Sequence, residues 1–269
     1  MNETERYFFD INGFLIIENV LSEADIELAN AAIDHYQSDI RPRPENQSLA
    51  GGSAAFTGVR GRLELSRRLL ELESHWCDVF RRLLDHPRLV GILDELLEPG
   101  FRLDHMPMLL AMEEGCEGFK LHGGGIPHDP SQSYMVSNGR IYTGLTVACW
   151  QLTDIAPGDG GFCCIPGSHK ANFPCPDEIR SGVEGGDLLV QPKLPAGSLL
   201  VFTEALTHGT LPWAASHPRR SILYKYTPGF MNWAPAPDYP SSLLDELTPA
   251  QRELLAPAAR AVRNPPSYD

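Results

Sequence analysis

The sequence has no long hydrophobic run and little positive charge. No stretch of its 269 residues approaches the roughly 20 consecutive apolar residues that a membrane helix needs. The opening MNETERYFFD lacks the basic segment and apolar core of a signal peptide. The formal net charge is −13, from 22 Lys and Arg against 35 Asp and Glu, and a surface of that sign repels phosphate backbones. We therefore expect a soluble cytoplasmic enzyme that binds neither membranes nor nucleic acid.

The sequence also lacks paired cysteine motifs, internal repeats and low-complexity tracts. Its six cysteines show no CxxC spacing, so the pattern predicts neither a zinc site nor a disulfide framework, but reduced and mostly buried thiols. The length and the ordinary globular composition predict one domain over residues 1–269.

The order of apolar patterns predicts helices first and strands afterwards. GFLIIENV (13–20) indicates a strand, Ser22 with Asp25 indicates the start of a helix, and a helical stretch over 63–97 is broken at Asp85-His86-Pro87. Short β-branched and aromatic runs divided by Gly and Pro fill 101–230, and TPAQ at Thr248 predicts a last helix in the 231–269 tail. We predict a mainly β fold with flanking helices, a sandwich or jelly roll preceded by a helical region over 1–100.

Residues 41–62, RPRPENQSLAGGSAAFTGVRGR, follow neither helical nor strand periodicity. Such a long loop in a compact domain is usually functional or disordered. One interpretation is a plain connection. The other is a lid over the substrate, with arginines facing inward from among Arg41, Arg43, Arg60 and Arg62.

Four side chains with complementary chemistry follow one another in the β region. His122 and His208 are candidate metal ligands, and Arg219 and Ser221 share one face of a strand because strand side chains alternate. A guanidinium beside a hydroxyl suits a carboxylate, which the arginine can bind through two hydrogen bonds. His169, in the PGSHK turn, is expected to order its loop or to approach the pocket, and not to bind the metal.

The chain resembles the phytanoyl-CoA dioxygenase family of non-haem Fe(II), 2-oxoglutarate-dependent oxygenases. The likeness lies in GFLIIENVLS, WQLTD, GDGG, IPGSHK, the distal His208 with R-x-S after it, and TPAQRELL, in that order. It implies a double-stranded β-helix, His122 and His208 as iron ligands, and Arg219 with Ser221 on the far carboxylate of 2-oxoglutarate. It further implies that iron, 2-oxoglutarate and O2 together attack an aliphatic C–H bond.

The family pattern has His-x-Asp or His-x-Glu, whereas here Gly124 stands at the carboxylate position. Three interpretations follow. In the first, which we favour marginally, chloride fills the vacancy as in the similar His-x-Gly halogenases, and the product is chlorinated. In the other two the enzyme is a hydroxylase whose third ligand is Asp129, or Glu204 four residues before His208. The last requires a bend, because residues four apart in a regular strand are ~13 Å apart.

The remaining candidates concern co-substrate and substrate. Lys120, two residues before His122, is expected on the same face. It either pairs with 2-oxoglutarate or an anionic substrate, or is a solvated charge at the edge of the strand. The pocket candidates are Tyr134, Trp213 and Arg60, with Tyr142 and Trp233, while Trp150 suits the core. If the lid arginines converge with Lys120, the small-molecule substrate is anionic, a nucleotide or an amino acid. A rival function is a metal-binding jelly roll without redox chemistry, an isomerase or a sensor.

Overall fold

An antiparallel sheet of eight strands forms the larger layer of the molecule, which is a computed structural model describing residues 1–259. Its strands run in the order β1 (Phe14–Ile17), β11 (Leu199–Thr203), β9 (Thr146–Gln151), β13 (Arg219–Thr227), β5 (Met108–Met112), β3 (Leu63–Leu65) and β2 (Ile40–Pro42), with β4 (Arg102–Leu103) also paired to β13. Every strand pair in this layer is antiparallel.

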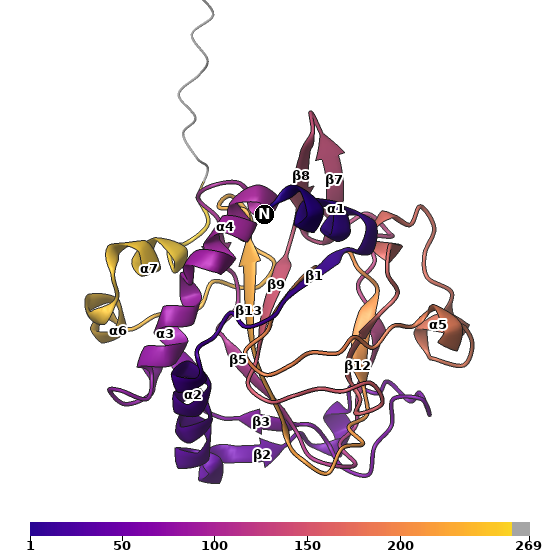
Figure 1. Ribbon diagram of the computed structural model, residues 1–269, viewed down its shortest axis with the longest axis horizontal. Helices are drawn as coiled ribbons and strands as arrows, with labels where there is room; N and C mark the ends of the chain where they lie inside the picture. Colours follow the sequence, from indigo (N-terminus) through magenta and orange to yellow (C-terminus); the bar gives the residue numbers. More distant parts are fainter. Residues whose placement is uncertain (260–269) are drawn as a thin grey trace, which may run out of the picture.

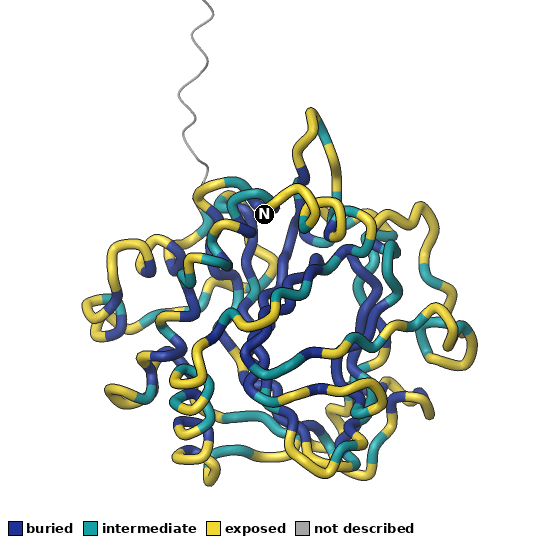
Figure 2. Tube along the Cα trace, viewed as in Figure 1, coloured by how far each residue is buried: buried dark blue, intermediate teal, exposed yellow. Residues whose placement is uncertain are grey.

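A smaller antiparallel sheet faces the first. It contains β10 (Gly161–Cys164), β12 (His208–Leu211) and β6 (Phe119–His122), and a separate ribbon pairs β7 (Tyr134–Ser137) with β8 (Arg140–Thr143). Buried side chains such as Phe162 and Phe202, with ring centroids 4.9 Å apart, fill the space between the sheets. Figure 2 shows burial concentrated along these two sets of strands. The predicted mainly β jelly roll with flanking helices is therefore confirmed.

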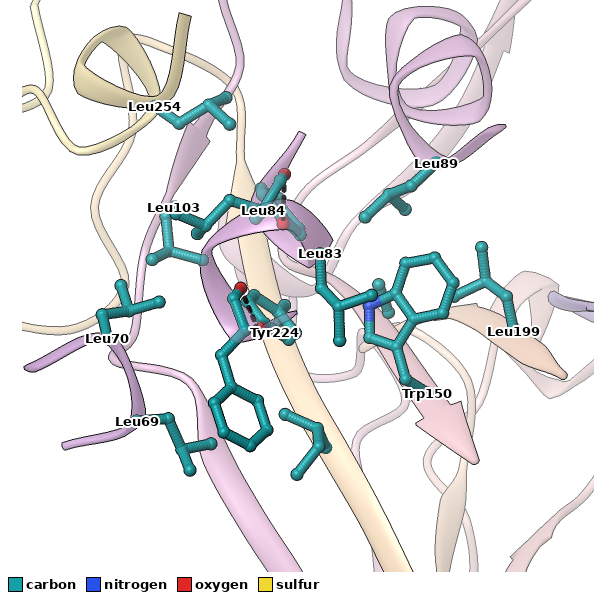
Figure 3. Close-up of a cluster of buried hydrophobic side chains, with 14 of the residues drawn as sticks. Leu69, Leu70, Leu83, Leu84, Leu89, Leu103, Trp150, Leu199, Tyr224 and Leu254 are labelled. Carbon is teal, nitrogen blue, oxygen red and sulfur yellow. Dashed lines mark hydrogen bonds between the residues drawn. The ribbon is translucent and has the colours of Figure 1, made fainter. Parts of the chain in front are cut away.

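Helices cover the outer face of the larger sheet. Figure 1 shows α2 (Glu23–His35), α3 (Asp78–Leu84) and α4 (Pro87–Leu97) along that side, opposite β12. Tyr224 and Tyr226 point out of β13 into this helical layer, where their hydroxyls donate to the carbonyls of Phe80 (2.7 Å) and Leu84 (2.8 Å). Figure 3 shows leucines packed around Tyr224 and Trp150, so Trp150 lies in the core as predicted. The other helices are α1 (Glu3–Asn12), α5 (Asp177–Arg180), α6 (Ser241–Glu246) and α7 (Pro249–Leu254).

The helix ends predicted from capping residues and from proline are confirmed. The Ser22 hydroxyl accepts from the amide of Asp25, α3 ends at Leu84, and α4 begins at Pro87. Thr248 and Gln251 form the predicted capping box of α7. Residues 260–269 of the predicted tail lie outside the described residues, and the single domain remains a prediction.

One expectation for the first hundred residues is wrong. α1 lies in the region predicted to be mostly helical, although no start signal for it was named; Asn2 and Glu5 form its capping box, and Gly13 ends the helix in the left-handed region. The predicted helix from residue 63 is instead β3, which pairs with β2 (Ile40↔Leu65), and α3 begins only at Asp78. The apolar spacing there reflects burial of Leu69 and Leu70 under the helical layer rather than helical periodicity.

The segment 41–62 begins in β2 with Arg41 and Pro42, and its middle part packs against the outside of the smaller sheet. Phe56 is fully buried in a cluster with Leu121 and Cys163, and its carbonyl accepts from the amide of Gly118 (2.8 Å). The carbonyl of Leu49 accepts from the amide of Lys120 (3.1 Å), extending the edge of β6. Packing of this kind is more ordered than a plain connection, and Arg62, the last of the four predicted arginines, is buried. The lid stays a prediction. No helix among residues 1–259 has both the length and the hydropathy of a membrane span.

Candidate metal centre

Two histidines and a glutamate meet between the two sheets. His122 ends β6 and His208 begins β12; the two residues are paired in register, with ring centroids 4.2 Å apart. Glu204 follows β11, and its Oε2 lies 3.8 Å from Nε2 of His208. The potential ligand atoms of the three residues all lie within 4.8 Å of one another. This is a donor set of two imidazoles and one carboxylate, which could hold a metal ion.

Glu204 reaches the histidines because residues 204–207 form a turn. β11 ends at Thr203, whose carbonyl accepts from the amide of Leu206 (2.9 Å), and β12 begins only at His208. The expectation that Glu204 and His208 share one strand, about 13 Å apart, is therefore wrong. The turn also contains the bend that this interpretation of Glu204 required.

Hydrogen bonds fix which nitrogen of each histidine is free. Nδ1 of His122 contacts the carbonyl of Lys120 (3.0 Å), and Nδ1 of His208 contacts the carbonyl of Leu206 (2.7 Å). Because a carbonyl only accepts, each Nδ1 carries the proton and each Nε2 presents a lone pair. The geometry thus orients both rings for ligation through Nε2.

The charges of the site also suit a cation. Burial and then the neighbouring His208 lower the pKa of His122 to about 3, and burial lowers the pKa of His208 as well, so both rings are neutral near pH 7. Burial alone would raise the pKa of Glu204. The nearby Lys225 and the two histidines outweigh that effect and lower the pKa to about 2. The carboxylate is therefore ionised, and its Oε1 accepts from Nζ of Lys225 at 2.8 Å.

The glycines after His122 make room for this turn. A Cβ on Gly123 would lie 2.5 Å from the carbonyl oxygen of Leu206 and 2.6 Å from that of Glu204, and φ is +76°. Only glycine tolerates both the approach and the backbone conformation. A Cβ on Gly124 would meet Oγ1 of Thr207 at 3.0 Å, and Gly124 does not line the cavity that holds the cluster. In this structure Gly124 faces the turn, and the carboxylate beside the histidines is that of Glu204.

Asp129, the other predicted source of a carboxylate, has a local role. Its Oδ1 accepts from the amide (2.8 Å) and hydroxyl (2.7 Å) of Ser131 and caps a short 3-10 helix at 130–132. Among the described residues it is not part of the metal-ligating group.

A cavity of about 110 Å³ joins the cluster to two buried arginines. Arg219, at the start of β13, is 1% exposed and Arg62 is 8% exposed, and the Nε of each has no hydrogen-bond partner among the described residues. Burial and the charge of Arg219 lower the pKa of Arg62 to about 10, which still leaves it protonated. One nitrogen of Arg219, Nη1, donates to the sulfur of Met112 (3.3 Å). Buried guanidinium groups without an anionic partner are costly, so this end of the cavity fits an anion.

The residues around Arg219 are arranged largely as the strand pattern predicts. Ser221 shares the inward face of β13, but its hydroxyl donates to Oε1 of Gln151 (2.7 Å) and does not line the cavity. Arg220 points to the other face and pairs with Asp34 at 2.5 Å. Lys225, which sequence reasoning missed, lies six residues after Arg219 on the same face; alternation along the strand could have found it.

Lys120 does not share the face of His122. Between His122↔His208 and Phe119↔Thr210, β6 contains one more residue than β12, a β-bulge that breaks the alternation. Phe119 consequently stacks on His122 with centroids 4.0 Å apart, while Lys120 is exposed and its stem lies over Gly51. The expectation that Lys120 shares the face of His122 is therefore wrong, and of its two alternatives the solvated edge charge agrees with the structure.

The other pocket candidates are scattered. Arg60 pairs with Glu113 (2.9 Å) at the surface, and Trp213 is buried in the core between the sheets, where its Nε1 donates to the carbonyl of His217 (2.7 Å). Neither lines the cavity. Trp233 is half-exposed and stacks on His105. His169 is buried and bonds the carbonyl of Asp10 (2.9 Å), which orders its loop as expected.

A second cavity, of about 670 Å³, is formed by the loops that leave the strands of the site. Gly125 and Ile126 follow His122, Phe230 and Met231 follow β13, and the predicted Tyr134 and Tyr142 also line it. The Tyr134 hydroxyl donates to Asp10 (2.5 Å). A cavity of this size and largely apolar lining is typical of a small-molecule site.

An antiparallel jelly roll with two histidines, a carboxylate and a buried arginine between its sheets defines a class, the mononuclear non-haem metal oxygenases. The comparison with protein families agrees. The chain belongs to the phytanoyl-CoA dioxygenase (PhyH) family, whose model matches residues 9–221. It is thus a member of the Fe(II), 2-oxoglutarate-dependent oxygenases, as the motifs predicted.

Solved structures with the same fold include enzymes of this class. HygX from Streptomyces hygroscopicus with nickel and 2-oxoglutarate bound is 26% identical, with a TM-score of 0.67 over 86% of this chain and 88% of that one. AviO1 from Streptomyces viridochromogenes Tue57 is 18% identical, with a TM-score of 0.60 over 89% and 98%. The epimerase SnoN from nogalamycin biosynthesis is 18% identical, with a TM-score of 0.58 over 85% and 83%. A search of curated protein sequences finds no match.

Proposed function

We propose that this protein binds Fe(II) through His122, Glu204 and His208 and oxidises a C–H bond of a small molecule with 2-oxoglutarate and O2. The observation that carries the proposal is the cluster itself, in which two neutral imidazoles and one ionised carboxylate come within 4.8 Å. Two histidines and a carboxylate are the donor set of non-haem Fe(II) oxygenases. HygX has also been solved with iron bound.

The end of the cavity that contains the two arginines is the proposed binding site of 2-oxoglutarate. We assign Arg219, supported by Arg62, to the carboxylate of 2-oxoglutarate farthest from the metal. Both guanidinium groups are buried with an unpartnered Nε, and an incoming carboxylate would satisfy them. We assign no direct contact with 2-oxoglutarate to Ser221, because its hydroxyl donates to Gln151 and the residue does not line the cavity.

When bound, iron with 2-oxoglutarate and O2 supplies the oxidising power. The protein's own side chains orient and shield it. The hydrogen bonds to Nδ1 hold both imidazoles in the ligating tautomer, and Lys225 keeps Glu204 ionised. Apolar walls keep bulk water from the reacting centre, and they come from Phe119, Phe162, Phe202 and Leu223.

We propose hydroxylation rather than chlorination. Chlorination of this type needs a coordination position that no protein carboxylate takes. The marginal preference for chloride came from Gly124, and the position of Glu204 beside both histidines removes its main support. A non-redox isomerase or sensor is disfavoured, because neither function needs two buried arginines to bind the carboxylate of 2-oxoglutarate.

The substrate is proposed to bind in the larger cavity, whose wall includes Gly125 and Ile126 of the loop that follows His122. Recognition of an anionic nucleotide or amino acid would need Lys120 and several of the arginines in 41–62 to converge on the site. Of these residues only Arg62 lines the cavity. The largely apolar cavity of about 670 Å³ instead favours a neutral, ring-bearing molecule. Two relatives accommodate bulky small molecules, since HygX has been solved with hygromycin B and SnoN with nogalamycin RO.

The test is product analysis across a panel of candidate substrates. The iron-loaded protein is incubated with 2-oxoglutarate, O2 and a set of ring-bearing metabolites, with and without chloride, and succinate is quantified. We expect substrate-stimulated succinate and a product heavier by one oxygen in both conditions. A chlorinated product would support the halogenase instead, and no succinate under any condition would overturn the oxygenase proposal.

A further inference from the structure

Lys225 contacts Glu204, the proposed metal ligand that lies outside the His-x-Asp or His-x-Glu pattern of the family. It projects from β13 on the same face as Arg219, and its Nζ lies 2.8 Å from Oε1 of Glu204. The other oxygen of that carboxylate, Oε2, faces Nε2 of His208 at 3.8 Å. The two oxygens of Glu204 therefore have different surroundings, one beside a cation and one beside the histidines.

The position of Lys225 is fixed from several directions. Its backbone carbonyl accepts from the amide of Asp104 (2.7 Å), and the residue pairs with Val147 of β9. The ammonium lies 5.8 Å from the centroid of the Trp233 ring, a cation–π contact. Trp233 is itself held by its amide, which donates to Oδ2 of Asp104 (2.9 Å). The side chain is 17% exposed, so the ion pair with Glu204 is largely shielded from water.

We propose that Lys225 is a positioning residue that occupies one oxygen of Glu204, so that the carboxylate offers a single oxygen to the metal. Carboxylates can bind metal ions through one oxygen or two. A Glu204 that used both would take a coordination position that 2-oxoglutarate needs. The inference rests on the proposed function, and it makes Lys225 a determinant of co-substrate binding rather than of metal binding.

The test uses cobalt(II) in place of iron, so that binding is measured without turnover. Wild type is compared with Lys225→Met, the conservative Lys225→Arg, and Lys193→Met as a control at an exposed lysine. Cobalt is titrated first and 2-oxoglutarate second, and the visible cobalt bands report changes in coordination. The folded state of each variant is checked by thermal unfolding.

Lys225→Met is expected to bind cobalt at least as tightly as wild type, since a positive charge beside the metal has been removed. Its affinity for 2-oxoglutarate should fall by roughly 10- to 100-fold, the range typical of groups that orient metal ligands. Its cobalt spectrum before 2-oxoglutarate is added should differ from that of wild type. Lys225→Arg should restore most of the affinity, and Lys193→Met should match wild type.

A crystal structure of cobalt-loaded Lys225→Met gives the direct check. Both oxygens of Glu204 at bonding distance from the metal would support the proposal. An unchanged cobalt spectrum and 2-oxoglutarate affinity in Lys225→Met would overturn it while leaving the proposed function intact. A wild-type protein that binds no cobalt would overturn the metal site itself, and the role of Lys225 with it.

Discussion

At the scale of single residues, the proposed chemistry depends on which carboxylate lies beside His122 and His208. Glu204 is 4% exposed and has an ion-pair partner for one oxygen, whereas the carboxylate of Asp129 accepts a hydrogen bond from Ser131. Gly124, where the family pattern has an acid, lies against Thr207. The chemistry of the site thus follows from a residue that the usual spacing of the motif does not mark.

Glu204→Gln should weaken metal binding by more than about tenfold, a loss that even outer-shell changes can cause. The amide keeps the shape of the side chain but loses the charge that attracts a cation. Calorimetric titration with Fe(II) or Co(II) under anaerobic conditions measures the effect. Asp129→Asn is the matched control, and equal losses in the two variants would contradict the assignment of Glu204.

Arg219→Met should weaken binding of 2-oxoglutarate by about 2 kcal/mol or more, corresponding to roughly 30-fold, because it removes one partner of a buried charge pair. Metal affinity should be unchanged. The adjacent Arg220→Met serves as the control, since Arg220 pairs with Asp34 on the opposite face of β13. An equal loss in Arg220→Met would mean that the co-substrate lies elsewhere.

At the scale of secondary-structure elements, two local irregularities build the site. The turn at 204–207 places Glu204 beside His208. The bulge in β6 places Phe119, and not Lys120, on the inner face of the sheet. Strand periodicity placed Arg219 and Ser221 on one face, because β13 is regular there. The same periodicity failed for Lys120 and Glu204, since neither a bulge nor a tight turn leaves a mark in residue spacing.

Gly123→Ala tests the packing of the glycine loop on the turn. Alanine at φ +76° costs about 1 to 2 kcal/mol of backbone strain, and its Cβ would also press on the carbonyls of Leu206 and Glu204. The control is Gly139→Ala, which has a similar φ of +72° with nothing within 4 Å. Both variants should lose stability in thermal unfolding, but only Gly123→Ala should also lose metal affinity.

At the scale of the whole molecule, the fold class was predictable and the assembly of the cavity was not. Alternating runs over 101–230 and the ordered motifs around His208 and Arg219 pointed to a jelly roll. Which of four arginines in 41–62 would face inward depended on how that segment packs over β6, with Phe56 as its anchor. Such long-range packing is invisible to periodicity, so Arg62 could be named only as one of four.

The metal-free protein should lose stability on acidification below about pH 6.5. Burial lowers the pKa of His122 to about 3 and that of His169 to about 4. As the pH falls, these two imidazoles therefore bind protons in the unfolded chain before they do so in the folded protein. The stability is complete above the unfolded pKa and declines as pH falls toward the folded values, by up to about 1.4 kcal/mol per pH unit for each histidine. Denaturant unfolding from pH 7 to 5 measures this slope. His169→Gln should reduce it, whereas a change at exposed His75 should not.

The most direct test of the central claim is a crystal structure of the protein with Fe(II) and 2-oxoglutarate, prepared without O2 and with chloride present. We expect iron bound by His122, His208 and one oxygen of Glu204, with the carboxylate oxygen ~2.0 to 2.2 Å from the metal. We also expect the far carboxylate of 2-oxoglutarate on Arg219. Iron held by the two histidines with chloride beside Gly124, and Glu204 turned away, would contradict this expectation.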